Sequence, residues 1–473
     1  MSESDFEAPD TAAAEPVAAD DRMDEDDRLK PEFVRQVMDR VQSGDADGAR
    51  ALVEPLHPAD IADLFELVDR DERPALAAAL TDLLDADVLA EMNEWVREEF
   101  LDTLEPHEVA DIAGQLDTDD AVAMIEEMDE DDQRAVLSAL EPEDRAAIEE
   151  ALTYPEESAG RLMQRDLIAV PEHWTVGQVI DYLRSNDDLT TDFWEIFVVD
   201  PQHHPIGTCM LSWVLRSPRN ISIVDVMKRE QTLIPVDMDQ EEVALRFQKY
   251  ALISAAVVDQ SGRLVGMITV DDIVHIIQEE ASEDILRLSG AGDGDINEPI
   301  VGTIQRRLTW LVINLGTAII AAAVVGLFQG TISRLVQLAV LMPIVSGMGG
   351  NAGTQTMAVA VRALALNELT SSNTRRMIFR ELTIAVANGL SLGTLLGVSV
   401  ALFYHYPDLG LVIALAMVIN NLVAGLFGIA VPVVLDKVGV DPAVSSAVFV
   451  TMMTDVMGFF SFLGLATVWG LSS

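Results

Sequence analysis

The pattern of hydrophobic and polar positions separates a charged first part of the chain from an apolar second part. After residue 307 the chain carries five apolar segments, each long enough to cross the ~30 Å hydrocarbon layer of a membrane as a helix of about 20 residues. They run over 308–328, 335–360, 378–404, 409–435 and 444–471. The pattern therefore predicts a membrane domain with five spans over 308–473.

Basic residues lie on one side of these predicted spans. Arg306 and Arg307 precede the first span, four arginines lie between the second span and the first turn of the third, and Lys437 lies between the fourth and fifth. The two other loops hold only Arg334. Because loops rich in Lys and Arg stay in the cytoplasm, we expect a multi-pass cell-membrane protein with residues 1–307 cytoplasmic and an extracellular C-terminus.

Two further patterns precede the membrane part. Residues 27–155 read as short helices, and a Leu-x-Pro phrase that ends at Pro58, Pro106 and Pro142 places proline and acids in the first helical turn. This predicts an acidic domain of short helices stacked as a superhelix.

Residues 163–215 and 227–274 repeat one order: a short strand, an amphipathic helix, two apolar strands split by a turn, and a closing helix. The matched positions are Met163 with Met227, Val198-Val199-Asp200 with Val257-Val258-Asp259, and Gly207 with Gly266. The repeat predicts two α/β domains. A charged connector over 281–307 then leads as a helix into the first span.

Charge is divided as sharply as hydropathy. The chain has 79 Asp and Glu and 30 Lys and Arg, for a net charge of −49, yet from Val301 onward we count six acids and eight bases. So negative a first part would repel phosphates, which excludes nucleic-acid binding. The single cysteine, Cys209, excludes a disulfide framework and thiolate metal sites.

The abundance of carboxylates has a second interpretation. Most of the bases are Arg, and dense carboxylates with few lysines keep a protein hydrated in concentrated salt, where charge repulsion is screened. We therefore expect a halophilic source, so that many of the acids are salt adaptation rather than ion sites. Residues 1–26 are acidic, rich in Ala and Pro, and lack the apolar core of a secretory signal, which predicts a disordered tail.

The second predicted span is unusual at its centre. Between Pro343 and Thr356 it has four glycines within seven residues, followed by polar side chains. Such glycines either let neighbouring helices pack closely or mark broken or tightly packed backbone that lines an aqueous path. In the second case carbonyls such as that of Gly350 and the side chains of Asn351 and Thr354 would meet water.

Asp455 is the carboxylate that lies deep in a predicted span, between Thr454 and Val456 in the fifth span. A carboxylate at that depth costs several kcal/mol unless it faces water, a cation or a partner, and the predicted spans offer no deep arginine. This predicts a role in cation transport. The spans contain no His or Cys, so oxygen ligands remain, and these suit Mg²⁺, which keeps several of its waters. Two copies of Asp455 in a symmetric dimer would balance the charge of a dication.

The order of these domains resembles the MgtE family of magnesium channels and transporters. The resemblance covers about residues 30–473 and rests on these motifs: Pro343 with Gly349-Gly350-Asn351-Ala352-Gly353-Thr354-Gln355, Arg362-Ala363-Leu364, Asp441-Pro442-Ala443 and Thr454-Asp455-Val456-Met457-Gly458. It implies a multidomain membrane protein: a helical N-domain (27–155), a tandem pair of CBS domains (156–219 and 220–280), a connecting plug helix (281–307) and a five-helix transmembrane domain.

The resemblance also implies a function and its sites. It implies a homodimer that takes up Mg²⁺ along its electrochemical gradient, with a pore metal site of Asp455, Thr451, Thr454, Asn351, Thr354 and Gly350. Mg²⁺ bound between the acidic N-domain and the CBS domains would close the pore. The implied regulatory ligands are Asp271, Asp272, Glu280, Glu283, Asp284, Glu241, Asp119 and Asp120.

CBS pairs often bind ATP or another adenine nucleotide, and Thr269 and Asp272 would then hold the ribose. Trp213 replaces Asp272 in the first copy. Three positions depart from the family pattern: Thr354 stands where Asn is common, Ala447 where a polar residue is common, and His275 where a sensing Asp is expected. The helix N-caps Asp119 and Asp120 also have a simpler interpretation as solvated caps.

Two other classes of function stay open. The chain could be a proton- or sodium-coupled divalent cation exporter, in which Asp455 carries a proton, or a CBS membrane sensor that does not transport. An enzyme is not expected, because the chain has no intact P-loop, nucleophile elbow or HExxH motif and its seven histidines are scattered. Transport of Co²⁺, Ni²⁺ or Mn²⁺ beside Mg²⁺ also stays open.

Overall fold

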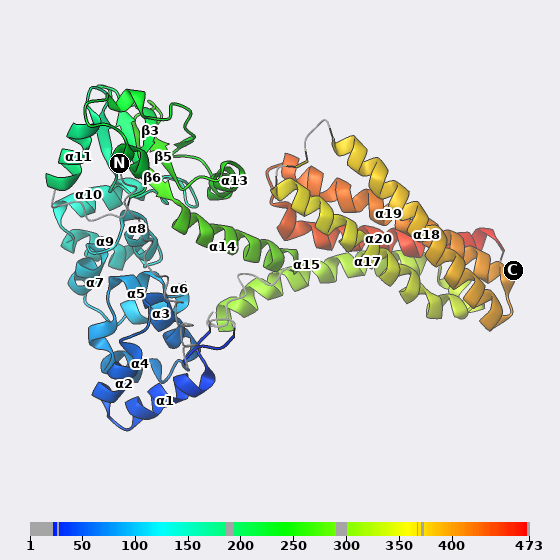
Figure 1. Ribbon diagram of the computed structural model, residues 1–473. Helices are drawn as coiled ribbons and strands as arrows, with labels where there is room; N and C mark the ends of the chain where they lie inside the picture. Colours follow the sequence, from blue (N-terminus) through cyan, green and yellow to red (C-terminus); the bar gives the residue numbers. More distant parts are fainter. Residues whose placement is uncertain are drawn as a thin grey trace, which may run out of the picture. The chain divides into compact units, whose positions relative to one another are not determined.

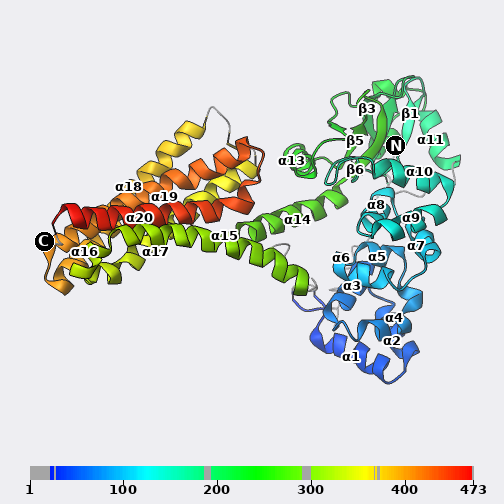
Figure 2. The same ribbon diagram turned by 180° about the vertical axis from the view of Figure 1, so that it is seen from behind.

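The chain forms two compact units, residues Met1–Ile273 and Val274–Ser473 (Figures 1 and 2). The computed structural model describes residues 22–25, 28–185, 193–289, 300–366, 368–369 and 373–470. Most of the predicted tail over 1–26, and residues 290–299 of the predicted connector, lie outside the described residues. Each unit has its own hydrophobic cores.

The first unit begins with short helices, as the Leu-x-Pro phrases predicted. In chain order they are α1 (Pro31–Gln42), α2 (Ala46–Val53), α3 (Pro58–Leu67), α4 (Arg73–Ala79), the 3-10 turn η1 (Thr81–Leu83), α5 (Ala86–Ala90), α6 (Glu94–Leu101), α7 (Pro106–Ala113), α8 (Thr118–Glu126), α9 (Glu130–Ala139) and α10 (Pro142–Ala151). α3, α7 and α10 each start at the proline. At α7 the Glu105 N–H also donates to the Glu108 carboxylate at 2.9 Å, which satisfies a backbone donor that the helix leaves unpaired.

These helices enclose two successive cores. The first gathers buried side chains between Leu29 and Val96, and the second gathers those between Leu101 and Ala151. An ion pair of low exposure joins them, because Arg97 Nε donates to Glu127 Oε2 at 3.1 Å. The short helices therefore stack in chain order, each core closing against the next.

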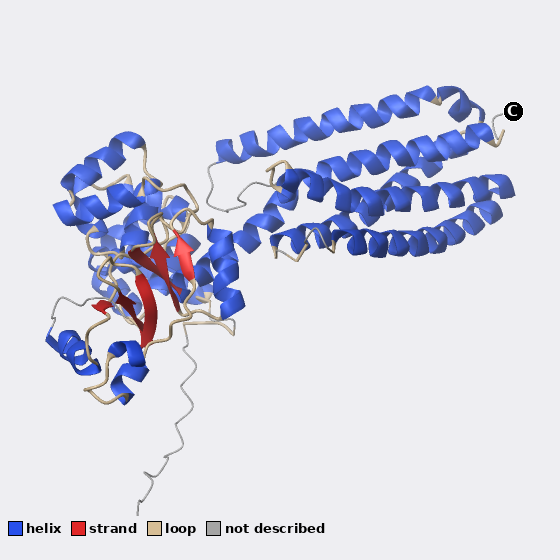
Figure 3. Cartoon of the chain, turned by 90° about the horizontal axis from the view of Figure 1, so that it is seen from above, coloured by secondary structure: helices blue, strands red, loops and turns tan. Residues whose placement is uncertain are grey.

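Two three-stranded sheets follow, and they have the same topology (Figure 3). The first contains β1 (Ala169–Pro171), β2 (Glu195–Val199) and β3 (Pro205–Met210); the second contains β4 (Leu233–Pro235), β5 (Ser254–Val258) and β6 (Leu264–Thr269). In both sheets the first pair is parallel, the second pair is antiparallel, and the register shifts within the matched Val-Val pair, Val198/Val199 and Val257/Val258. The predicted internal repeat is thus confirmed, and the two copies also share a register shift that the sequence did not predict.

Helices complete each copy of this repeat. They are α11 (Val176–Ser185) and α12 (Leu211–Arg216) in the first copy, then η2 (Ile223–Asp225), α13 (Gln240–Tyr250) and α14 (Val270–Ser289). The copies interlock: Gln164 exchanges backbone hydrogen bonds with Met267 at 2.8 and 2.9 Å, and Thr208 does so with Lys228 at 3.0 and 2.8 Å. The start of each copy is therefore attached to the last strand of the other.

The second unit is a bundle of long helices. After the end of α14 it contains α15 (Ile300–Leu327), α16 (Gln329–Arg334), α17 (Gln337–Ala365), α18 (Thr374–Tyr404), α19 (Pro407–Lys437) and α20 (Pro442–Val468). α19 packs against α17, α18 and α20 (Figure 1). Residues 281–289 continue α14 and residues 300–307 are the first turns of α15, so the described parts of the predicted connector belong to two helices.

Four helices among the described residues are long and apolar enough to cross a membrane: Ile300–Leu327, Thr374–Tyr404, Pro407–Lys437 and Ser446–Val468. α17 has 29 residues but is not among the four, because its centre is rich in Gly and polar side chains. The membrane character of this unit is supported, and the count of five spans stays a prediction that depends on α17.

Glycines bring the bundle helices together. In α18, Gly389, Gly393 and Gly397 recur at four-residue spacing and lie against the backbone of α19, where a methyl group on Gly393 would come within 2.7 Å of the Ala414 carbonyl oxygen. α17 is one unbroken helix despite Pro343, and its Gly349 and Gly353 are buried against neighbouring side chains. The backbone of this segment is therefore not broken, and close packing explains these two glycines. That the segment lines an aqueous path stays a prediction.

Candidate functional site

Asp455 lies in the middle of α20, and a side chain of α17 reaches it. The hydroxyl of Ser346 donates a hydrogen bond to Asp455 Oδ1. Both residues are partly exposed in the single chain. Ser346 is the partner of Asp455 that sequence reasoning missed, although it lies in the same Gly-rich stretch, one turn before Gly350.

The other predicted pore residues on α17 fall on the same side as Ser346. Residues 346, 350 and 354 are spaced by four, so they follow one stripe along the helix. The Thr354 hydroxyl donates to the Gly350 carbonyl at 3.0 Å, and both Thr354 and Asn351 are exposed. The structure therefore aligns Gly350 and Thr354 with the Ser346–Asp455 pair, while Asn351 lies beside them.

The two threonines of α20 differ. Thr451 is exposed, whereas Thr454 is wholly buried and its hydroxyl donates to the Thr451 carbonyl at 2.9 Å. The Thr454 methyl group lies beside Gly353. As the chain stands, Thr454 packs α20 on α17 rather than presenting its hydroxyl. Ala447, one of the departures from the family pattern, packs against Met357, Val361, Ala443 and Val450.

In the first unit, acids that are distant in sequence come together at two helix starts. Asp119 and Asp120 lie in the first turn of α8, and Asp271 and Asp272 lie in the first turn of α14. Asp119 is 8 % exposed, and its Oδ1 atom has no hydrogen-bond partner in the part of the chain that the structure describes. Burial, and then the charges of Asp272, Asp120 and Asp117, hold the pKa of Asp119 well above its ordinary value.

Asp272 is perturbed in the same way. Burial raises its pKa to about 6, the charges of Asp271 and Asp120 add to the rise, and a hydrogen bond from the Thr269 hydroxyl at 2.7 Å opposes it. Asp119, Asp120, Asp271 and Asp272 are called here the α8–α14 cluster, and the two raised pKa values show that its carboxylates repel one another when ionised. Such a cluster favours a cation.

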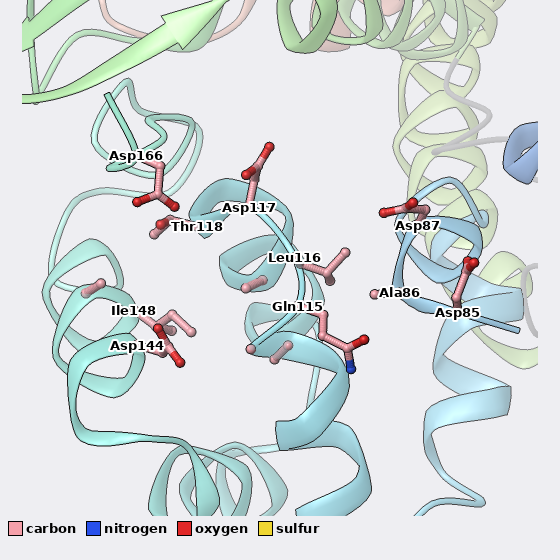
Figure 4. Close-up of a pocket in the computed structure, with 14 residues that line it drawn as sticks. Asp85, Ala86, Asp87, Gln115, Leu116, Asp117, Thr118, Asp144, Ile148 and Asp166 are labelled. Carbon is pink, nitrogen blue, oxygen red and sulfur yellow. The ribbon is translucent and has the colours of Figure 1, made fainter. Parts of the chain in front are cut away.

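An open cavity of about 600 Å³ lies in the same unit and is lined by parts of α5, α7, α8 and α10 (Figure 4). Its acidic lining residues are Asp85, Asp87, Asp117, Asp144 and Asp166. Asp117 connects this cavity to the α8–α14 cluster, because burial and the charges of Asp166, Asp271 and Asp87 raise its pKa. Sequence reasoning missed these aspartates, since the chain is acidic throughout and no local signal distinguishes them.

The remaining predicted regulatory residues lie elsewhere on α13 and α14. Glu241 lies in the first turn of α13. Glu280 and Glu283 lie further along α14, where Glu283 forms an ion pair with Arg287; the side chain of Asp284 lies outside the described residues. Across the described ranges, no group of three or more His, Cys, Asp or Glu side chains is arranged to hold a metal ion.

Comparison with known families gives matches to three models. A model described as a divalent cation transporter, MgtE, matches residues 342–465; the MgtE intracellular N domain matches residues 56–157; and a CBS domain matches residues 223–279. The first of these contains Ser346, Gly350, Thr354 and Asp455. The second contains Asp119 and Asp120, and the third contains Asp271 and Asp272.

Individual proteins are similar over nearly the whole chain. A protein of Thermus thermophilus named magnesium transporter MgtE is 30 % identical over 444 residues, which is 93 % of this chain and 98 % of that protein. A Bacillus subtilis protein of the same name is 27 % identical over 439 residues, covering 93 % and 97 %. A crystal structure of the cytosolic domain of the Mg²⁺ channel MgtE in complex with ATP is 29 % identical, with a TM-score of 0.47, and covers 51 % of this chain and 99 % of that one.

Proposed function

Because the chain belongs to the MgtE family of divalent cation transporters, we propose that it carries Mg²⁺ across the cell membrane, along the electrochemical gradient of the ion. The observation that carries the proposal is the Ser346–Asp455 pair between α17 and α20. Asp455 is a carboxylate within an apolar helix, and its hydrogen-bond partner is the hydroxyl of Ser346. No arginine of the described spans pairs with Asp455. An anionic group in that setting gains most from a cation.

The donor set indicates how the ion is recognised. Asp455, Ser346, Thr354 and the Gly350 carbonyl offer oxygen atoms, and Mg²⁺ prefers oxygen ligands while it keeps several of its waters. Asp455 and the stripe of α17 would therefore bind a hydrated ion, with Thr451 and Asn351 at the margin of the path. Hydrated Co²⁺, Ni²⁺ and Mn²⁺ share this chemistry and are further candidates.

The site needs a second carboxylate, which one chain does not supply. We propose a homodimer in which two copies of Asp455 face one path and balance the charge of a dication. The stripe of α17 is open toward a second copy of the chain. Ser346 and Asp455 are partly exposed, and Asn351 and Thr354 are exposed.

Gating follows from the α8–α14 cluster. Mg²⁺ bound there would neutralise Asp119, Asp120, Asp271 and Asp272 and hold the two helix starts together. Such differential binding would favour one conformation and close the path when internal Mg²⁺ is high. The proposed regulatory set has four further members, which would take part only if α13 and α14 move: Glu280, Glu283, Asp284 and Glu241. The first unit would lie in the cytoplasm, and the C-terminus would lie outside the cell.

An adenine nucleotide would compete with regulatory Mg²⁺ for Asp272. The Thr269 hydroxyl and the Asp272 carboxylate lie side by side, as two ribose ligands would. Since Asp272 belongs to both proposed sites, nucleotide and regulatory Mg²⁺ would influence each other's affinity.

The test is Mg²⁺ uptake into liposomes in matched salt under an inside-negative potential, with internal Mg²⁺ absent or millimolar. We expect wild type to conduct Mg²⁺ and internal Mg²⁺ to suppress the flux. Asp455→Asn should reduce the flux at least about tenfold, because loss of the negative charge weakens ion binding by more than about 1.4 kcal/mol. Asp408→Asn, at the exposed start of α19, is the matched control and should conduct as wild type does.

Other results would favour the alternatives. Flux that follows a proton or sodium gradient instead of voltage would indicate a coupled exporter. A wild type that carries no Mg²⁺ under any of these conditions would indicate a sensor, and equal flux in Asp455→Asn would remove Asp455 from the path.

A further inference from the structure

Two adjacent amide side chains, Asn420 and Asn421, are completely buried in the middle of α19. Their exposed fractions are 0 % and 1 %. In each, the amide nitrogen donates one hydrogen bond, and the Oδ1 atom has no hydrogen-bond partner among the described residues. They form a matched pair on one helix, but they face different neighbours.

Asn420 lies between the two helices that form the proposed ion site. Its Nδ2 atom donates to the Val345 carbonyl of α17 at 2.9 Å, and Val345 directly precedes Ser346. On the other side, a methyl group on Gly458 of α20 would come within 2.8 Å of the same nitrogen. Gly458 follows Asp455 by three residues, so it lies one helical turn away on the same face.

Glycine is what lets the amide fit. A methyl group on Gly349 would overlap the Asn420 amide nitrogen, and one on Gly458 would press against it. Gly349 lies one turn after Val345 on α17. Asn420 therefore fills a space bounded by glycines from both helices, and neither helix can shift toward α19 without striking it.

This arrangement has an energetic cost. A buried oxygen without a hydrogen bond loses its hydration and gains nothing in return, a penalty that an apolar side chain of similar volume would avoid. Packing alone does not account for an amide here, whereas a directional bond from α19 to the backbone beside Ser346 requires one.

We infer that Asn420 is a positioning residue of the ion path, which sets how α17 and α20 lie against each other and so holds the Ser346 hydroxyl at the Asp455 carboxylate. The inference rests on the proposed role of Asp455. Asn421 supplies the contrast, because its amide donates to the Met417 carbonyl of its own helix at 2.9 Å and its Cβ faces Gly389 of α18.

The transport experiment compares Asn420→Ala with Asn421→Ala in the liposome assay. Each change removes one buried amide and one hydrogen bond, so the loss of folded protein should be similar. We expect Asn420→Ala to raise the apparent KM for Mg²⁺ about fivefold, the factor that one hydrogen bond contributes, and to reduce discrimination between Mg²⁺ and Ca²⁺. Asn421→Ala should leave both quantities as in wild type, with any change confined to the amount of active protein.

A second measurement does not depend on transport. Cysteines placed at Ser346 and Asp455 in a Cys209→Ala background can be joined by a short bifunctional thiol reagent, and the rate reports how the two positions lie. We expect Asn420→Ala to slow this crosslinking and Asn421→Ala to leave it unchanged.

Equal behaviour of the two alanine variants in KM, ion discrimination and crosslinking would overturn the inference and make both asparagines packing residues. If Asp455→Asn still transports Mg²⁺ while Asn420→Ala slows crosslinking, the proposed ion site fails but the positioning role of Asn420 stands. The two failures are therefore distinguishable.

Discussion

Arg287 Nη1 donates to Asp441 Oδ2 at 2.9 Å, and Asp441 Oδ1 accepts the backbone N–H of Ala443 at 2.7 Å. One carboxylate thus caps the start of α20 and binds a side chain near the end of α14. α14 begins with Asp271 and Asp272, which belong to the proposed regulatory site, and α20 carries Asp455. The Arg287–Asp441 pair therefore connects the end of α14 to the start of α20, so that a movement of α14 would be felt by α20.

We expect Arg287→Gln to weaken the suppression of Mg²⁺ flux by internal Mg²⁺ while leaving flux in its absence unchanged. The reason is that the variant loses the charged contact to α20 but keeps Asp455 and the cap of α20. Both side chains are about one third exposed, so the pair contributes little to stability by itself. Dose–response curves for internal Mg²⁺ give the measurement, with Arg263→Gln, in an exposed pair with Asp259, as control. Identical curves for Arg287→Gln and wild type would show that this contact does not transmit gating.

The raised pKa of Asp272 predicts a pH dependence of stability in Mg²⁺-free buffer. A folded-state pKa of about 6, above the ordinary value of 3.8, means that the folded protein binds the proton more tightly than the unfolded chain does. The stabilisation is complete below about pH 3.8 and is lost as the pH rises to about 6, by at most about 3 kcal/mol. Asp272→Asn should therefore unfold at a higher temperature than wild type at pH 7, and the difference should shrink toward pH 4.

Thermal unfolding of the full chain in detergent and EDTA measures this, with the exposed Asp39→Asn as control. If the difference in unfolding temperature between Asp272→Asn and wild type stays constant from pH 4 to pH 7, the pKa of Asp272 is not raised in the folded protein. Added Mg²⁺ should narrow the gap at pH 7, because the cation stabilises the ionised carboxylates of wild type.

Two glycines of α17 should respond oppositely to the same substitution. Gly349→Ala places a methyl group on the Asn420 amide, and overpacking of this kind costs about 1–3 kcal/mol. The methyl group of Gly347→Ala meets no atom of the described residues within 4 Å, so its effect is the gain of roughly 0.5–1 kcal/mol that alanine has over glycine within a helix. Unfolding in detergent compares the two; equal stability would mean that Asn420 relaxes away from Gly349 without cost.

The ion pair between Arg97 and Glu127 should resist salt. Their side chains are 10 % and 20 % exposed, and removal of one partner leaves a desolvated charge. Arg97→Ala should cost about 3–5 kcal/mol. Arg35→Ala breaks the exposed pair with Glu32 and should cost less than about 1 kcal/mol.

Denaturation at low and at molar salt distinguishes the two pairs. The loss in Arg97→Ala should persist at molar salt, because screening acts weakly on buried charges, whereas any loss in Arg35→Ala should vanish. Complete rescue of Arg97→Ala by salt would show that water reaches this pair.

Much of the architecture depends on local pattern, and there the sequence sufficed. Helix starts at Pro58, Pro106 and Pro142, the duplicated strand order and the apolar second part each follow from residues close together in the chain, whose periodicity and backbone preferences act locally. Asp455 is a candidate from the sequence for the same reason, since a lone carboxylate within an apolar run is costly wherever the helix packs.

Only the tertiary structure decided which distant groups meet. Ser346 reaches Asp455 across 109 residues, Asn420 enters a space that glycines of two other helices leave open, and Asp119 faces Asp272 from another domain. Local preferences leave such encounters undetermined because they depend on how whole helices and sheets pack. In an acidic chain, burial beside like charges, rather than the presence of a carboxylate, marks an aspartate as a candidate for function.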